Sequence, residues 1–467
     1  MNETLQRFRE TVTGKTVALL GMGISNRAAV DFLLSMGAKL TARDKNKEPD
    51  EDLVAFLRKR GVGMIFGEDY LSDISEDIVL KSPGIRYDIP ALLAARERGC
   101  EITSEMEIFC KLCPAKIFAV TGSDGKTTTT TIVSEMLKRA AAKTGVRVYL
   151  GGNIGTPLLP YLTEMTEDDF AVLELSSFQL HTMQPSPISA IVTNVTPNHL
   201  NWHTDMAEYT ESKKNIFLRQ RADARLVLNA ENELTRRMAA EATAPVTLFS
   251  SVGDPGGERA CYLDGDTVCY RDGETVYTLM TRGEIRLLGL HNAENYMAAI
   301  SAVWGYVGVE EMRAVAADFG GVRHRLQFIM DLDGVKCYNS SIDTSPTRTV
   351  AALSCFDGGL VTIVGGYDKH IPIEPMLAPL MQKSKYVVAT GDTGLSVVRA
   401  LRERGFARDR VAYIGDFDEA VRFALHVAKS GDSVLLSPAA ASFDAFKNFE
   451  ARGDRFCEIV CLEMSKV

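Results

Sequence analysis

The chain has 467 residues, 46% of them hydrophobic and 24% charged, which is ordinary globular composition. This length predicts about three domains, since one domain usually takes roughly 100–200 residues. The formal net charge of −9 argues against nucleic acid as a partner, because phosphate backbones select basic surfaces. The polar opening MNETLQRFRE and the lack of an apolar run near ~20 residues predict neither a secretory signal nor membrane insertion.

The nine cysteines are odd in number and scattered, which favours a reducing, cytoplasmic compartment over a disulfide framework. Cys110 and Cys113 form the one pair at metal-like spacing. Because no second pair lies at a matching distance, we expect two small side chains near a domain junction rather than a zinc or redox site.

Predicted strands and helices alternate almost throughout, which indicates an α/β fold with mainly parallel sheets. In the first segment, strands are expected at residues 16–20, 39–42 and 78–80, with a helix over 27–35. The first strand precedes the glycine turn GMGISN (21–26), the second ends at Asp44, and the third precedes the turn SPG (82–84).

A second segment starts near residue 114. Its strands are expected at residues 116–120, 170–175 and 188–195. The first of them runs directly into residues 121–128 and a long helix rich in Thr and Ala. Residues 250–286 differ, because short strands are separated there by Asp-Gly pairs, which predicts an antiparallel excursion.

A third segment begins around Gly320 and Gly321. Its strands are expected at residues 335–338, 360–364, 386–389 and 433–436, each followed by turn residues and a helical stretch. The expected domains are therefore residues 1–113, 114–321 and 322–467.

The strongest motif reads GSDGKTT between a strand and a helix. Its glycines allow a tight turn whose backbone N–H groups point at phosphate oxygens, and the helix N-terminus adds partial positive charge. Lys126 would neutralise the β- and γ-phosphates, and the Thr127 hydroxyl would ligate Mg²⁺. The loop is shorter than the GxxxxGK form, since Val120 stands where that pattern has its first glycine. We interpret it as an ATP loop made of Gly122, Ser123, Asp124, Gly125, Lys126, Thr127 and Thr128.

The turn at residues 21–26 resembles a dinucleotide fingerprint, with Asp44 about twenty residues on as a ribose ligand. Asn26 stands where the fingerprint has its third glycine. The partial match favours a nucleotide ligand other than a nicotinamide cofactor, and a purely structural turn remains open.

Glu174, His199 and Lys213 form a further set of polar residues. Glu174 lies near the end of a buried strand, the usual place of a ligand-facing carboxylate in parallel sheets, and His199 also follows an apolar strand. Either residue alone fits a capped strand end or a satisfied histidine. Together, after a phosphate loop, they predict a Mg²⁺-dependent ATP site, because ATP chemistry needs carboxylate and hydroxyl ligands for the metal.

These motifs occur in the same order in the Mur ligases, which the chain resembles over essentially its whole length. The matching features are the short loop with Lys126, ELSSFQL at 174–180, NVT at 194–196 before His199, Tyr209 with Lys213, LHNxxN at 290–295 and the late Arg325. The motif GGNIG at 151–155 and the segment 437–453 resemble the branch of the family that adds D-glutamate to UDP-N-acetylmuramoyl-L-alanine.

The resemblance implies a Rossmann-like N-terminal domain for the UDP-sugar, a central P-loop ATPase-type domain and a Rossmann-like C-terminal domain for the amino acid. It also implies a two-step reaction in peptidoglycan precursor synthesis. The alanyl carboxylate attacks the γ-phosphate of ATP to give an acyl phosphate, which the amine of D-glutamate then attacks. We expect the enzyme to be a monomer.

The resemblance further implies roles for single residues. It assigns catalysis to Lys126, Glu174, His199, Lys213 and Arg325, and ATP contacts to Asn295 and Arg325 beside the loop. It assigns one Mg²⁺ to Thr127 and Glu174, and a second to His199 and a carbamate on Lys213, because a bare ammonium would repel a metal. It assigns the UDP-sugar to Gly23, Ile24, Ser25, Asp44, Lys45, Gly84, Asn153 and His199. It assigns D-glutamate to Thr344, Lys369, Ser442, Phe443 and Phe449.

The chain departs from the family pattern at a few positions. The usual NDSKAT reads NSSIDT at residues 339–344, so Ser340 and Ile342 replace an acid and a lysine, while Asp343 adds an acid. Asp124 replaces an asparagine of the phosphate loop, and Ala440 replaces a common cysteine.

Three other functions fit these residues less well. A related ligase for another amino acid, including the folylpolyglutamate type, is disfavoured by residues 442–449. A nicotinamide-dependent oxidoreductase leaves the second phosphate loop unexplained. A P-loop binding module without turnover is disfavoured by Glu174, His199 and Lys213.

Overall fold

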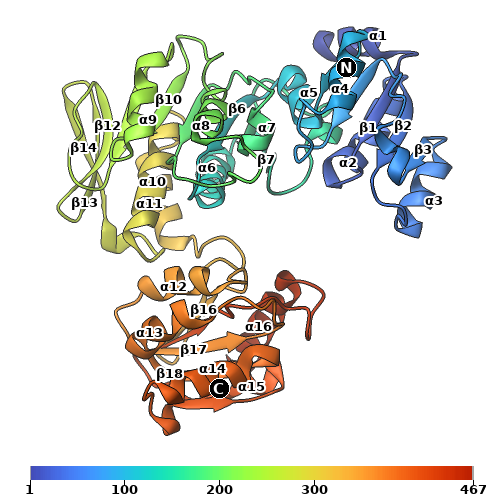
Figure 1. The fold of residues 1–467 in the computed structure, drawn as a ribbon. Coiled ribbons are helices and arrows are strands. Elements are labelled where there is room, and N and C mark those ends of the chain that lie inside the picture. Colours follow the sequence, from blue (N-terminus) through green and yellow to red (C-terminus); the bar gives the residue numbers. More distant parts are fainter. Residues whose placement is uncertain (1, 465–467) are drawn as a thin grey trace. The chain divides into compact units, whose positions relative to one another are not determined.

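The computed structural model describes residues 2–464, which form three β-sheets that follow one another along the chain (Figure 1). The chain divides into two compact units. The first unit extends to residue 284 and includes residues 291–317, and it holds the first two sheets. The second unit comprises residues 285–290 and the chain from residue 318 onward, and it holds the third sheet. The predicted α/β fold is confirmed.

The first sheet contains β1 (Thr16–Leu20), β2 (Lys39–Asp44), β3 (Gly63–Phe66), β4 (Ile78–Lys81) and β5 (Glu101–Thr103). Its helices are α1 (Glu3–Val12), α2 (Ile24–Ser35), α3 (Glu51–Lys59), α4 (Pro90–Glu97) and α5 (Glu105–Leu112). The strands are parallel, in the order β3-β2-β1-β4-β5. The winding direction reverses between β1 and β4, and ligands of such sheets bind where it does, at the carboxyl ends of the strands.

Side chains of β1 alternate between the two faces of this sheet. Val17 and Leu19 pack with buried residues of α2 and α5, whereas Ala18 and Leu20 pack with buried residues of α4. Helices therefore cover both faces, which explains why the strands are apolar runs rather than alternating ones.

The second sheet contains β6 (Lys116–Thr121), β7 (Val148–Gly152), β8 (Phe170–Glu174), β9 (Ser189–Val192), β10 (Arg225–Asn229), β11 (Val246–Ser250), β12 (Arg259–Asp264), β13 (Thr267–Asp272) and β14 (Thr275–Thr281). Its helices are α6 (Lys126–Ala141), α7 (Ser177–Leu180), α8 (Met206–Lys214), α9 (Glu233–Met238), α10 (Leu290–Val303) and α11 (Val309–Asp318). The strand order is β14-β13-β12-β11-β10-β9-β6-β8-β7, with parallel pairs from β7 to β12.

Strands β12, β13 and β14 form the antiparallel excursion that the sequence predicts. Asp264 pairs with Thr267, and Asp272 pairs with Thr275, so each hairpin has a two-residue loop. Gly265 and Gly273 open these loops with φ of +61° and +62°. Such a left-handed backbone favours glycine in tight hairpins.

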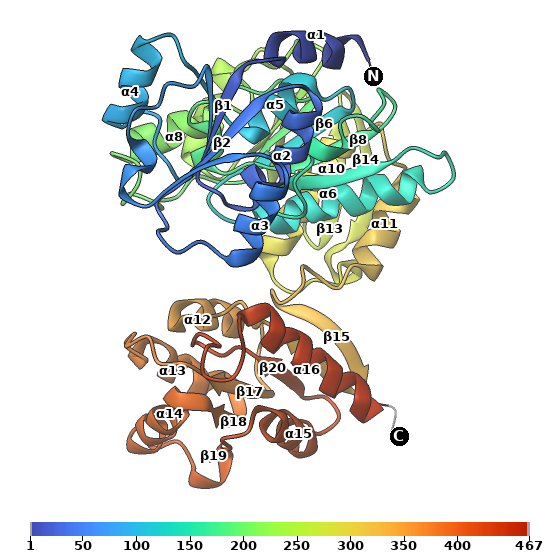
Figure 2. The same ribbon diagram turned by 90° about the vertical axis from the view of Figure 1, so that its right-hand side faces the viewer.

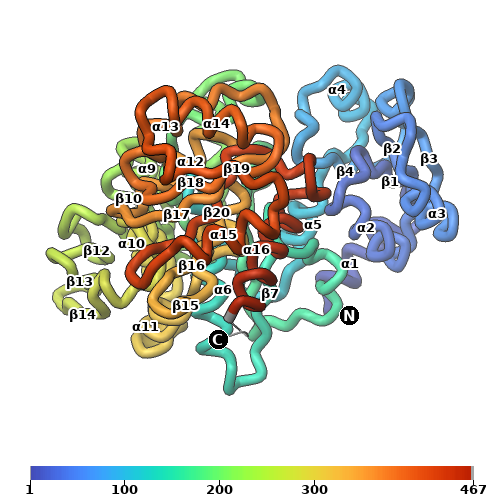
Figure 3. The backbone as a smooth tube through the Cα atoms, turned by 90° about the horizontal axis from the view of Figure 1, so that it is seen from below, coloured from blue at the N-terminus to red at the C-terminus, as the bar shows by residue number. Residues whose placement is uncertain are grey.

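The third sheet contains β15 (Gln327–Leu332), β16 (Val335–Asn339), β17 (Leu360–Gly365), β18 (Ser384–Thr390), β19 (Val411–Tyr413) and β20 (Ser433–Leu436). Its helices are α12 (Pro346–Ser354), α13 (Glu374–Lys383), α14 (Gly391–Glu403), α15 (Phe417–Val427) and α16 (Phe449–Met464). The order is β15-β16-β20-β17-β18-β19, with β15 antiparallel. Helices α12, α13 and α14 cover one face, and α15 and α16 cover the other (Figures 2 and 3).

The structure corrects the predicted bounds at two turns. Helix α2 begins at Ile24 rather than residue 27, because Gly23 is its extended N-cap. Strand β9 ends at Val192 rather than residue 195, because the next two residues turn and bond to the phosphate loop. The bounds of seven further strands are not predicted from the sequence: β3, β5, β7, β10, β11, β15 and β19. No helix among residues 2–464 combines the length and apolarity needed to cross a membrane.

Candidate active site

The predicted phosphate loop joins β6 to α6, and two of its glycines cannot be replaced without a clash. Gly122 has φ of +147°, and a Cβ there would lie 1.8 Å from Oγ1 of Thr193. Gly125, the N-cap of α6, has φ of +77°, and a Cβ there would lie 2.4 Å from Oδ1 of Asn295. The backbone therefore turns tightly against its neighbours, and the loop ends at the N-terminus of a 16-residue helix.

Residues after β9 hold this loop in place. Thr193 donates through Oγ1 to the Asp124 carbonyl at 2.6 Å, and the Asn194 side chain accepts from the Asp124 amide at 2.9 Å. Ser123 donates through Oγ to the Thr196 carbonyl at 3.0 Å. These bonds fix the loop before any ligand binds, which lowers the ordering cost of binding.

Lys126 is the first residue of α6 and folds back over the loop. Its Nζ donates to the carbonyls of Gly122 at 3.0 Å and Ser123 at 2.8 Å. The ammonium is therefore positioned at the glycine turn, beside the helix N-terminus. This arrangement suits an anionic phosphate group, which both the charge and the backbone N–H groups attract.

Helix α8 brings Tyr209 and Lys213 to the same loop. Lys213 is 1% exposed and donates through Nζ to the Gly122 carbonyl at 2.7 Å. Its ammonium lies 4.4 Å from the centroid of the Tyr209 ring. Burial, together with the charge of Lys126, holds the pKa of Lys213 well below its ordinary range. The two lysines predicted to take part in catalysis therefore do converge on one turn.

Glu174 ends β8 and is also buried, at 1% exposed. Its Oε1 accepts from Nδ2 of Asn153 at 2.8 Å. Its Oε2 is buried and has no hydrogen-bond partner among the described residues. An orphaned carboxylate oxygen in a protein interior is unfavourable unless something else satisfies it, so this atom fits a metal or a bound donor.

His199 follows the same sheet in a left-handed backbone, with φ of +55°. Its ring packs edge-on against Phe178, with centroids 4.9 Å apart. Desolvation, with the charges of Lys126 and Lys213, lowers the pKa of His199, which favours its neutral imidazole. A neutral imidazole has a free lone pair for a metal.

The N-terminal glycine turn is also closed by side chains. Asn26 donates through Nδ2 to the carbonyls of Leu20, Gly21 and Leu80, which explains an asparagine where a fingerprint has glycine. Asp44 accepts from the Met22 amide at 2.6 Å through one carboxylate oxygen and from the Asn46 amide through the other. Asp44 therefore orders the turn.

A cavity of about 610 Å³ lies over the start of α2. It is lined by Met22, Gly23, Ile24, Arg27, Ala28, Asp31, Phe56, Pro157 and Pro160. Ile24 is 78% exposed here. Gly23 and Ile24, predicted to bind the UDP-sugar, thus lie at a hollow that is bounded on another side by Pro157 and Pro160, in the segment between β7 and β8.

The residues predicted to bind D-glutamate lie in the second unit. Thr344 and Lys369 line one shallow pocket with Tyr367. Lys369 has its ammonium 5.9 Å from the centroid of the Phe443 ring, and Phe443 is 61% exposed. Ser442, in contrast, is buried. Phe449 begins α16, and its carbonyl accepts from Oγ of Ser341 at 2.8 Å.

Arg452 supports this region from within, although the sequence offered no role for it. Its buried guanidinium donates to the carbonyls of Ala440 and Ala441 and to both oxygens of Ser341. The segment leading to Ser442 is therefore held by one arginine. Arg452 thus brings two distant parts of the run at residues 437–453 together in the fold.

The departures at residues 339–344 have structural counterparts. Asp343 is 6% exposed, and its Oδ2 accepts from Oγ of Ser437 at 2.8 Å. Burial raises the pKa of Asp343. Ser340 accepts through Oγ from the Leu326 amide at 3.1 Å. Both side chains therefore bond within the second unit, as does the backbone of the predicted ATP residue Arg325.

Comparisons with known proteins agree with this architecture. Family models match the Mur ligase MurD-like N-terminal domain over residues 15–104, the Mur ligase middle domain over 120–303 and the Mur ligase glutamate ligase domain over 324–440. The UDP-N-acetylmuramoylalanine–D-glutamate ligases of Acetivibrio thermocellus and Clostridium perfringens are 46% and 45% identical to the chain, over 98% of it and 99% of each relative.

Solved structures share the fold at lower identity. UDP-N-acetylmuramate-alanine ligase MurC of Thermotoga maritima matches with a TM-score of 0.57 at 20% identity, over 96% of this chain and 100% of that one. MurF of Acinetobacter baumannii matches with a TM-score of 0.56 at 16% identity, over 98% and 93%.

The chain has three α/β sheets and a glycine loop between a strand and a helix, which is typical of an enzyme that uses a nucleotide. The family matches show which class of enzyme this is. The chain belongs to the Mur ligase family. Within that family, its similarity over nearly the full length is to UDP-N-acetylmuramoylalanine–D-glutamate ligases.

Proposed function

We propose that the chain catalyses the ATP-dependent addition of D-glutamate to UDP-N-acetylmuramoyl-L-alanine, an amide-forming step of peptidoglycan precursor synthesis. One observation carries the chemistry: Lys126 and Lys213 both donate to the Gly122 carbonyl of one loop at the start of α6. The substrates are supported by 46% identity to a UDP-N-acetylmuramoylalanine–D-glutamate ligase over 98% of the chain.

The first step joins two anions and therefore needs positive charge. An oxygen of the alanyl carboxylate attacks the γ-phosphorus, the bond to the bridging oxygen breaks, and ADP leaves with the electron pair. Lys126 and the N–H groups of residues 122–128 stabilise the phosphate charge. Asn295, which lies against Gly125, and Arg325 are proposed as further ATP contacts.

In the second step, the amine of D-glutamate attacks the acyl carbon of the acyl phosphate. The tetrahedral intermediate collapses, phosphate leaves with the electron pair, and the nitrogen loses a proton to give the amide. We assign the amino acid to Thr344, Lys369, Ser442, Phe443 and Phe449. The ammonium of Lys369, the hydroxyl of the half-buried Thr344 and that of the buried Ser442 offer the donors that a dicarboxylate needs.

We propose two Mg²⁺ sites. Thr127 and Glu174 would hold one, which fits the unpartnered Oε2 of Glu174. His199 and a modified Lys213 would hold the other, which fits a neutral imidazole. When bound, Mg²⁺ neutralises phosphate charge.

A carbamate on Lys213 is proposed for a chemical reason. The neutral amine attacks CO₂ and loses a proton, and the product is an anionic oxygen ligand. The lowered pKa of Lys213 favours the neutral amine, whereas an ordinary lysine is almost wholly protonated at neutral pH. The same burial excludes water from the group.

The UDP-sugar is assigned to the first sheet and its junction with the second. The proposed contacts are Gly23, Ile24, Ser25, Asp44, Lys45, Gly84, Asn153 and His199. The cavity of about 610 Å³ over the start of α2 supports this placement, because a helix N-terminus attracts a diphosphate. We further propose a monomeric, cytoplasmic enzyme with domains at residues 1–113, 114–321 and 322–467.

The test is phosphate release from ATP with Mg²⁺ and UDP-N-acetylmuramoyl-L-alanine, with D-glutamate, L-glutamate, D-aspartate or no amino acid. We expect rapid release only with D-glutamate, together with the amide product by mass spectrometry. A faster reaction with another amino acid, or release that ignores the UDP-sugar, contradicts the proposal.

A further inference from the structure

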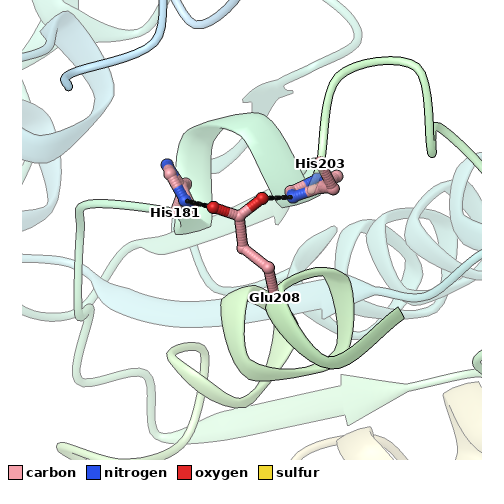
Figure 4. Close-up of side chains that lie close together, drawn as sticks. All are labelled: His181, His203 and Glu208. Carbon is pink, nitrogen blue, oxygen red and sulfur yellow. Dashed lines mark hydrogen bonds and ion pairs between the residues drawn. The ribbon is translucent and has the colours of Figure 1, made fainter. Parts of the chain in front are cut away.

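A charged cluster joins the two sheets of the first unit, outside the residues assigned above. Its centre is Glu208 on α8, flanked by His181 and His203 (Figure 4). Nε2 of His181 lies 3.1 Å from Oε1 of Glu208, and Nδ1 of His203 lies 3.4 Å from Oε2 of the same carboxylate. Arg86, which follows β4, pairs with both oxygens at 2.9 and 3.1 Å.

This cluster has metal-ligand composition, with three ligand atoms within 4.8 Å of one another. The geometry instead favours a hub of ion pairs and hydrogen bonds, in which His181, His203 and Arg86 surround Glu208. The two imidazoles approach different oxygens of the carboxylate (Figure 4), and the guanidinium of Arg86 already occupies both. A cation would have to displace a bidentate ion pair, one of the stronger interactions a carboxylate makes.

The Arg86 side of the hub belongs to the loop at residues 82–88, which contains Gly84, a predicted UDP-sugar residue. Arg86 donates to the Trp202 carbonyl at 2.8 Å and lies 5.0 Å from the centroid of the Trp202 ring. The indole of Trp202 donates to the carbonyl of Gly84 at 3.0 Å. Two residues earlier, Ser82 donates to the carbonyl of Gly21 in the first glycine turn at 2.9 Å. The loop at residues 82–88 is thus bonded to both sheets.

The Glu208 side of the hub belongs to the phosphate loop. Glu208 precedes Tyr209, which contacts Ser123 at 2.9 Å, and lies five residues before Lys213, which contacts Gly122. The Thr204 amide also donates to Glu208 at 2.7 Å. One carboxylate therefore connects the helix that supports the phosphate loop to the loop at residues 82–88, which is bonded to the first glycine turn.

We propose that Arg86 and Glu208 are positioning residues that set the UDP-sugar relative to the ATP loop, an inference that rests on the proposed function. The reacting carboxylate lies at the far end of a long substrate held by the first sheet. Its distance to the γ-phosphate therefore depends on how firmly the two sheets are joined, and small displacements of reacting groups have large effects on rate.

The experiment compares Arg86→Met, Glu208→Gln and the double variant with wild type. We expect each single variant to raise the KM for UDP-N-acetylmuramoyl-L-alanine by about tenfold or more and to lower kcat, with the KM for D-glutamate unchanged. Because the pair acts as a unit, the double variant should lose no more kcat/KM than the worse single variant. Arg86→Lys keeps the charge but not the bidentate geometry, and should recover part of the loss.

The matched control is the half-buried ion pair of Arg259 and Asp272, whose atoms lie 2.8 Å apart across β12 and β13. Arg259→Met and Asp272→Asn should leave all three KM values unchanged. A UDP-sugar KM that stays at the wild-type value in folded Arg86→Met, or losses that multiply in the double variant, overturns the proposal. If the wild-type enzyme does not ligate D-glutamate, the proposed function itself is wrong.

A measurement independent of turnover uses Trp202. The chain has two tryptophans, so Trp304→Phe leaves Trp202 as the reporter of the junction. We expect its emission to shift to the red when Arg86→Met or Glu208→Gln is added, since the indole then loses a covering partner. Unchanged emission in both variants contradicts the hub as the joint between the sheets.

Discussion

The hydroxyl of Tyr209 lies 2.9 Å from Oγ of Ser123, so helix α8 is hydrogen-bonded to the phosphate loop. The same helix turns Lys213 under the loop, one turn beyond Tyr209. Lys213, one of the proposed metal-binding residues, and the phosphate loop are therefore held together through α8. Changes at single lysines can then be interpreted as losses of charge, provided that the helix stays in place.

Lys126→Ala should abolish ligation while the fold is retained. The side chain supplies positive charge where phosphate charge develops, and each ~1.4 kcal/mol of lost transition-state stabilisation is a tenfold loss in rate. The measurement is phosphate release together with circular dichroism. Lys138→Ala, on the exposed side of the same helix, is the control and should stay active. Near-normal turnover in folded Lys126→Ala would falsify the assignment.

Lys213→Ala should be nearly inactive and should regain activity when acetate is added, because a small carboxylate can replace the carbamate oxygen. Wild-type activity should fall in CO₂-free buffer and recover with bicarbonate. Lys214→Ala is the control, since Lys214 forms ion pairs with Glu211 and Glu241. The carbamate proposal is wrong if Lys213→Ala is fully active without any addition.

D-Glutamate should be preferred at least about tenfold over L-glutamate, D-aspartate and D-glutamine, although Ile342 replaces a lysine. Charge-assisted hydrogen bonds contribute about 1.5–3 kcal/mol each, so several remaining donors can still discriminate. Lys369→Ala should raise the KM for D-glutamate, whereas Lys336→Ala, on the exposed side of β16, should not. An unchanged KM in Lys369→Ala removes this lysine from the amino-acid site.

Glu105→Gln should stabilise the protein at pH 8. Burial raises the pKa of Glu105 from 4.5 to about 7, so the folded state holds this proton more tightly than the unfolded state does. The stability contributed by the neutral side chain is complete below pH 4.5 and is lost as pH rises through about 7. Glutamine stays neutral at every pH.

The free energy of unfolding of the variant should therefore exceed that of wild type by about 1–3 kcal/mol at pH 8. This difference should become smaller toward pH 5. Urea unfolding at both pH values measures this difference. Glu101→Gln, at an exposed position of β5, should show no such pH dependence. A gap of equal size at both pH values shows that Glu105 does not titrate as its burial indicates.

Local sequence determined the geometry of the loop at residues 122–128. A strand, two glycines, a lysine and a helix lie within about a dozen residues, so their geometry follows from backbone conformation alone. The same holds for the hairpins at Gly265 and Gly273. The first and last residues of strands such as β7 and β10 could not be predicted from the sequence. Their apolar runs are short, and their burial comes from neighbours distant in the sequence.

Tertiary structure decided what the isolated residues mean. In the sequence, Asn26 stands where a dinucleotide fingerprint has its third glycine. In the fold, its side chain donates hydrogen bonds to three backbone carbonyls, which belong to two strands and a turn. Asp343 is only an added acid in the sequence, and in the fold its carboxylate is buried and accepts from Ser437. Arg86 and Glu208 lie 122 residues apart and carry no motif, yet they form one ion pair. Sequence alone could identify groups that act through the nearby backbone, whereas partners brought together by packing required the folded chain.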